Sequence, residues 1–170
     1  GLAVERWAGH AVKKLLTSGA EKLVLQPDQL PGVAKAEAGA HAAMGARLAS
    51  YRWDEFRTTL KPEQQPTLKT VEVMMEGPAG ARARAEKDAA VVEGVFFARD
   101  LVSEPPNVLY PETFAEQLRE LEGLGVEVDV LDPTTMEKLG MGALLGVAMG
   151  SVRGGRLVSM QWKGATSKNS

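Results

Sequence analysis

The chain has 170 residues, of which 44% are hydrophobic and 25% are charged, values that fit a globular protein of one or two domains. Its formal net charge is -2 and its lysines and arginines are scattered, so the sequence shows no basic stripe of the kind that binds nucleic acid. It has no cysteine, which excludes disulfides and thiolate chemistry, and no apolar run approaches the roughly 18 residues that cross a membrane.

The first eighty residues alternate between helical and strand patterns. Apolar residues at helical spacing predict a helix over 7–16, and the run Lys22–Leu25 predicts a short buried strand that a proline turn ends. An alanine-rich stretch predicts a second helix over 33–56, and residues 70–75 alternate well enough to predict a second strand. We interpret these elements as the back half of an α/β domain.

A long apolar helix is predicted to follow. Between Ala89 and Val102 the apolar residues cover nearly the whole circumference of a helix, which predicts that it is buried on all sides. The helix is expected to stop at Glu104, because Pro105 and Pro106 exclude the helical conformation there.

The last third of the chain begins with another helix and continues with strands. Pro111 suits a first helical position, and the helix that it starts carries an apolar face. Alternating valines predict a strand over 126–130, a short helical turn is expected over 134–138, and a last strand over 157–162. In that last strand Val158, Met160 and Trp162 share one side, which predicts a core face. Because predicted helices and strands alternate along the chain, the predicted fold class is α/β.

The glycine-rich run from Gly140 to Gly155 has the appearance of a phosphate-binding loop. Its spacing does not fit one, because no strand ends immediately before it and neither Lys-Ser nor Lys-Thr follows. We interpret these glycines as residues of tight turns and close packing.

No complete active site can be assembled from the remaining candidates. His10 and His41 lie on separate predicted helices without a zinc-binding partner pattern, and Ser151 lacks the surroundings of a nucleophile. The carboxylates that could pair for acid–base work or metal binding are Glu104, Glu112, Asp129 and Asp132. Nothing in their spacing selects them among 22 acidic residues, so we assign no catalytic and no metal-binding residue, and the substrate-binding residues are unknown.

Three segments, in order, carry a family resemblance. The first is ARDLV at 98–102 followed by EPPNVLYPETF at 104–114; the second is LGMGALLGV at 139–147 followed by Gly150-Ser151; the third is QWKG at 161–164. Together they resemble the leucyl aminopeptidases, also called cytosol aminopeptidases. One local departure is Tyr110, which stands where the family often has a threonine that caps the following helix.

The resemblance implies a domain division and a function. It implies part of an N-terminal α/β domain over 1–80, an interdomain helix over 81–105, and the start of the C-terminal peptidase domain over 106–170. Members of the family are cytoplasmic metalloproteases that remove N-terminal residues from peptides with two divalent ions, zinc or manganese, and they form hexamers. The family's metal ligands all come after the strand at 157–162, so the resemblance implies that this chain alone is inactive and binds no metal.

Two interpretations of the whole chain remain open. Because it opens on Gly1-Leu2 and closes on the small polar run 165–170, we expect it to be a piece of a longer peptidase. The alternative is that these residues form a functional unit of their own, a non-catalytic interaction or assembly module that lacks the metal-binding half.

Overall fold

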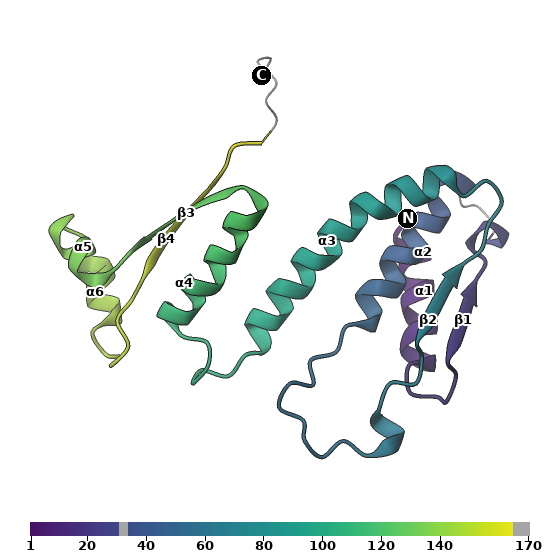
Figure 1. Ribbon diagram of the computed structural model, residues 1–170, viewed down its shortest axis with the longest axis horizontal. Coiled ribbons are helices and arrows are strands. Elements are labelled where there is room, and N and C mark those ends of the chain that lie inside the picture. Colours follow the sequence, from purple (N-terminus) through teal and green to yellow (C-terminus); the bar gives the residue numbers. More distant parts are fainter. Residues whose placement is uncertain (31–33, 165–170) are drawn as a thin grey trace. The chain divides into compact units, whose positions relative to one another are not determined.

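The computed structural model describes residues 1–30 and 34–164, which fall into two units, one from Gly1 to Val102 and one that begins at Ser103 (Figure 1). The first unit contains helices α1 (Leu2–Leu15), α2 (Lys35–Ser50) and α3 (Ala79–Ser103), with strands β1 (Lys22–Leu25) and β2 (Thr70–Val73). Two short 3-10 turns, Pro27–Gln29 and Pro62–Gln64, lie in its loops. The two strands pair in parallel, with Lys22 opposite Thr70 and Leu25 opposite Val73.

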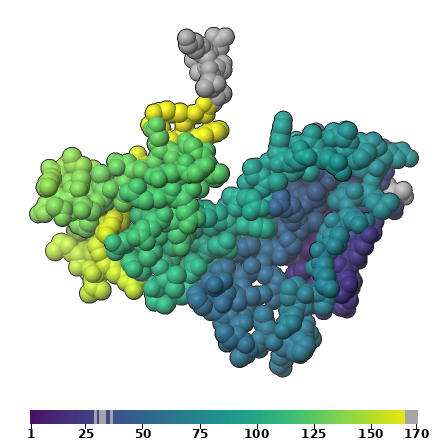
Figure 2. Space-filling model, viewed as in Figure 1, coloured from purple at the N-terminus to yellow at the C-terminus, as the bar shows by residue number. Residues whose placement is uncertain are grey.

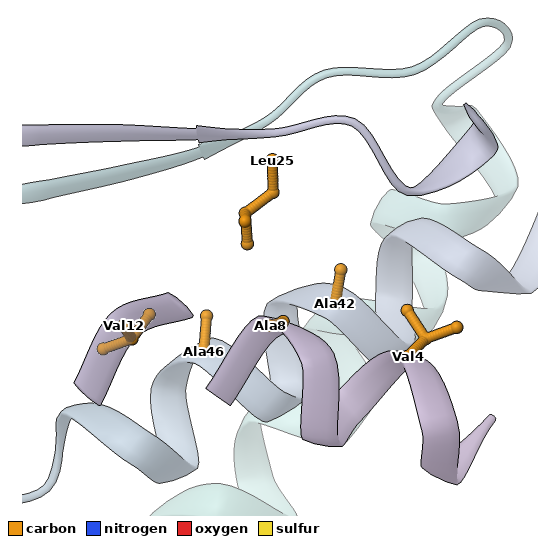
Figure 3. Close-up of a cluster of buried hydrophobic side chains, with 6 residues drawn as sticks. All are labelled: Val4, Ala8, Val12, Leu25, Ala42 and Ala46. Atoms are coloured by element: carbon orange, nitrogen blue, oxygen red, sulfur yellow. The ribbon is translucent and has the colours of Figure 1, made fainter. Parts of the chain in front are cut away.

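The core of the first unit lies between the two strands and helices α1 and α2. Helix α1 contributes residues at the i, i+4 and i+8 positions of one face, and α2 contributes two alanines four residues apart. Figure 3 shows Leu25 pointing from β1 toward these helices. The buried cluster consists of Val4, Ala8, Val12, Leu25, Ala42 and Ala46.

Helices α1 and α2 approach each other closely because glycines face the contact. A Cβ atom built on Gly45 would overlap the backbone carbonyl of Glu5 and would lie 2.6 Å from its Cα. On the other helix, a Cβ atom on Gly9 would lie 3.2 Å from the carbonyl oxygen of Gly45. The alanine-rich sequence of α2 therefore brings backbone against backbone, a contact that larger side chains would prevent.

The prediction that the long helix is buried on all sides is wrong for α3. Only Ala81 and Val92 are buried in it, whereas Val91 is 53% exposed and Val102 is 87% exposed. Figure 2 shows the teal atoms of α3 at the surface of the first unit. Apolar residues around a whole helix show how much of its surface could be buried. In the described residues, other elements cover only one side of α3.

The second unit pairs two strands around a helical connection. It contains α4 (Pro111–Arg119), the 3-10 turn Glu120–Leu124, β3 (Val126–Leu131), α5 (Pro133–Lys138), α6 (Gly142–Ala148) and β4 (Leu157–Trp162). Strands β3 and β4 are antiparallel, with Val126 opposite Trp162 and Leu131 opposite Leu157. Gly125, at φ 88°, ends the turn before β3, a backbone conformation that glycine adopts without strain.

Several sequence-based boundaries differ from the structure. The first helix begins at Leu2 instead of residue 7, and α2 ends at Ser50, where Tyr51 turns to an extended conformation, instead of continuing to residue 56. Residue 33, the expected start of α2, lies outside the described residues. Strands β1, β3 and β4 lie where they were predicted, but the expected core face of β4 is open, since Met160 is 52% and Trp162 is 72% exposed. No helix in the described ranges is long and apolar enough to cross a membrane.

We expect Gly45→Ala to destabilise the first unit by about 1–3 kcal/mol, because the added methyl group forces α1 and α2 apart. Gly94→Ala in α3 is the matched control: nothing lies within 4 Å of its Cβ position, so alanine should be neutral or stabilising. Chemical denaturation of both variants measures the difference. Equal stability of the two variants would contradict the close contact.

Helix α3 offers a second matched pair in Val92 and Val91. Val92→Asp places a carboxylate at a position that is 1% exposed, and we expect it to cost several kcal/mol of unfolding free energy. Val91→Asp lies on the open face and should change the melting temperature little. Similar losses in both variants would show that α3 is covered on both sides.

Candidate functional site

Arg153, in the loop that leads into β4, connects distant parts of the second unit. Its Nη1 donates a hydrogen bond to the carbonyl of Pro106 at 2.6 Å, and its guanidinium carbon lies 3.8 Å from the centre of the Tyr110 ring. Its backbone amide donates to Ser151 Oγ at 3.1 Å. Arg153 thus fastens the glycine-rich segment to the linker that precedes α4.

A second arginine reinforces the same connection. Arg156 Nη2 lies 3.0 Å from Glu112 Oε1 in the first turn of α4, and its Nη1 donates to the carbonyls of Gly154 and Gly155 at 3.2 and 3.1 Å. The Arg156 side chain is only 18% exposed, whereas that of Glu112 is 55% exposed, so water screens this ion pair from the glutamate side.

The start of α4 is capped without the side chain of Tyr110. Thr113 Oγ1 reaches back to accept from the Tyr110 amide at 3.0 Å, and it donates to the carbonyl of Val108 at 2.7 Å. The tyrosine ring is left to stack under Arg153. The departure noted in the sequence therefore exchanges a capping hydroxyl for a cation–π contact.

Asp132 caps helix α5. Its Oδ1 accepts from the Thr135 amide at 2.7 Å. Hydrogen bonds from Thr135, through its side chain first and its backbone second, lower the pKa of the Asp132 carboxyl because they favour the charged form. This carboxylate has a structural task at a helix start.

The remaining candidate carboxylates are not brought together. Glu112 pairs with Arg156, Asp129 is exposed on β3, and one oxygen of Glu104, Oε2, is buried without a hydrogen-bond partner in the described structure. Across residues 1–30 and 34–164, no three histidine, aspartate or glutamate side chains form a group that could hold a metal ion. The burial of Glu104 was not foreseeable from its spacing.

The histidines and Ser151 are likewise separate. His10 is exposed on α1, and Nδ1 of His41 donates to Glu5 Oε1 at 2.7 Å, linking α2 to α1. Ser151 is exposed in the second unit. These positions provide no nucleophile with an adjacent base.

The glycines between β3 and β4 shape the backbone. Gly140, at φ 75°, follows the C-cap residue of α5 and turns the chain away from that helix. A Cβ atom on Gly154 would lie 3.0 Å from Pro133 Cγ, and one on Gly155 would lie 3.2 Å from Ala148 Cβ. Turn formation and close packing, as interpreted from the sequence, account for these three.

Comparison with known proteins gives this arrangement a context. Residues 96–170 match the catalytic domain of the cytosol aminopeptidase family. The chain is 47% identical over 98% of its length to a probable cytosol aminopeptidase of Caulobacter vibrioides, and 51% identical over 72% to one of Methylorubrum populi. It spans 33% and 24% of those proteins, so it corresponds to a third or less of their length.

Solved structures show the same fold. A tomato leucine aminopeptidase mutant superimposes with a TM-score of 0.83 over 98% of the chain and 34% of that protein, at 22% identity. The bottromycin maturation enzyme BotP in complex with Mn gives a TM-score of 0.75 over 92% of the chain and 32% of the enzyme, at 29% identity. The α/β fold class predicted from the sequence is confirmed.

These matches define the class of protein: the second unit is catalytic-domain sequence of a peptidase, and a larger α/β unit from Gly1 to Val102 precedes it. The chain belongs to the cytosol aminopeptidase family, as its three segments predicted. The contacts of Arg153 and Arg156 therefore lie within the sequence that matches the catalytic domain, where they hold the segment before β4 against the start of α4.

The cap at Asp132 gives a pH-dependent prediction. Because the folded-state pKa lies below the ordinary value of 3.8, the carboxylate contributes stability that is present above pH 3.8 and is lost as the pH falls through the folded-state pKa. Asp132→Ser keeps an acceptor without titrating. We expect the melting temperature of the native chain to fall more than that of this variant as the pH is lowered below 3.8.

Asp129→Ser, on the exposed face of β3, is the control for that experiment. Its difference from the native chain should depend less on pH over the same range. If both serine variants showed the same pH dependence, the cap at Asp132 would not be the cause.

Proposed function

We propose that the chain is part of a leucyl aminopeptidase that removes N-terminal residues from peptides with two metal ions. The supporting observation is the 47% identity to a probable cytosol aminopeptidase along 98% of the chain, which includes the matched catalytic-domain segment at 96–170. The likeness to an enzyme solved in complex with Mn favours metal dependence.

The residues that the structure describes do not themselves form a two-metal centre. The described residues contain no group of three potential ligands, so we derive no catalytic step through a metal. We propose that zinc or manganese is bound by residues that follow β4 in the longer relatives. When bound there, such ions would supply Lewis-acid chemistry, which can polarise the scissile carbonyl and lower the pKa of a bound water.

The chain's own task in this proposal is structural. Residues 1–80 form part of the N-terminal α/β domain, 81–105 connect it to the peptidase domain, and 106–170 begin that domain. Arg153 and Arg156 hold the connection between linker, α4 and β4 in a fixed geometry. We further propose a cytoplasmic protein that assembles as a homo-oligomer, a hexamer, and acts on peptide substrates.

A chimera tests this function. The matching 167 residues of the Caulobacter vibrioides protein are replaced by this chain, and hydrolysis of leucine p-nitroanilide is measured with added manganese. We expect activity that a chelator removes, and no turnover by the 170-residue chain alone.

A folded chimera without activity, or appreciable turnover by the repurified chain alone, would overturn the proposal. The mass of the natural protein is the complementary measurement. A natural protein of 18.2 kDa would favour the non-catalytic interaction module, and a protein about three times larger would favour the peptidase.

A further inference from the structure

The first unit contains a groove that the peptidase proposal does not use. It has a volume of about 500 Å³ and opens between α1, the end of α2 and the last turns of α3. Leu48, Ala49 and Tyr51 contribute to an apolar floor. All of its lining residues belong to the unit that ends at Val102.

Basic side chains line this groove from two helices, and two arginines and a lysine among them carry a positive charge. Arg6, His10 and Lys13 lie at the i, i+4 and i+7 positions of α1 and therefore share one face of it. Arg99 adds a guanidinium from α3. The core face of α1 is a different one, so this basic face is free to meet a ligand.

The acidic group in the groove wall, Glu5, offsets part of this positive charge but forms no ion pair with Arg6 or Lys13. Glu5, the acid in the wall, accepts from His41. Among the described residues, none forms an ion pair within 4.0 Å of Arg6 or Lys13. Arg99 donates to the carbonyl of Leu48 at 3.0 Å and lies 5.2 Å from the centre of the Tyr51 ring, so its side chain is held in place.

We propose that this groove binds an elongated anion with two or more linked phosphate groups. Arg6 and Lys13 are seven residues apart, about 10 Å along the helix axis between their Cα atoms. An anion that extends over this distance meets both side chains without either bending toward the other. A linear oligophosphate supplies several charges over that length. Guanidinium groups match phosphate oxygens in a bidentate geometry, and the lysine adds a point charge.

Sequence reasoning missed this site. The basic residues looked scattered because three of them are spaced along α1 and the fourth lies far along the chain, and only the fold brings Arg99 beside them. The recurrence of basic residues at positions 6, 10 and 13 was the available signal.

Calorimetric titration of the 170-residue chain with tripolyphosphate, in a monodisperse sample at low ionic strength, tests the proposal. We expect saturable binding that Arg6→Gln and Lys13→Gln each weaken by about fivefold or more. Glutamine has a similar helix propensity to the residues it replaces, so α1 should be retained, and circular dichroism verifies this.

Lys14→Gln is the matched control, because Lys14 is the neighbouring cation on α1 but does not line the groove. It should change the affinity by less than about twofold. Absence of saturable binding, or equal weakening by all three variants, would overturn the proposal and would leave only general attraction of anions.

A parallel titration with ATP distinguishes the source of the phosphates. Tighter binding of ATP than of tripolyphosphate would place a nucleoside against the apolar floor. Equal or weaker binding of ATP, with the same variant dependence, would assign the groove to the phosphate chain itself. Neither result depends on peptidase activity.

Discussion

The close contact of α1 with α2 is the constraint on which the first unit depends. Because a backbone lies against a backbone at Gly45, the two helices act as one layer against the strands, with Leu25 reaching into their seam. Alanines bury little area each, so the stabilisation comes from many short contacts between well-packed atoms. The pair His41–Glu5 adds a polar link across the same seam, and both side chains are about one-fifth exposed.

The second unit is held together in a different way. Its helices are short and much of its apolar surface is open, as Val147 and Val152 illustrate. Directional contacts made by two arginines fix its loop instead, and one of these, Arg156, is largely shielded from water. The matched Caulobacter vibrioides protein is about three times longer than this chain. Its additional residues could cover apolar surface that is open in this unit.

Local pattern predicted the strands and the existence of the helices, because alternation and helical spacing are properties of neighbouring residues. It failed for the burial of α3, since burial depends on what the rest of the chain places beside a helix. It also failed for the contact of Arg153 with Tyr110, residues far apart in sequence. The family was accessible from three short segments, whereas the basic groove required the fold.

The parallel pairing of β1 with β2 has a consequence for folding. The partners Leu25 and Val73 are separated by all of α2 and a long loop, so this sheet closes only after a large loss of chain entropy. Helix α1 meets α2 across a shorter separation, and the seam between them carries the surface on which β1 rests. Because β1 rests on that seam, we expect the strands to pair on a helical layer that has already formed, and these non-local contacts to slow folding.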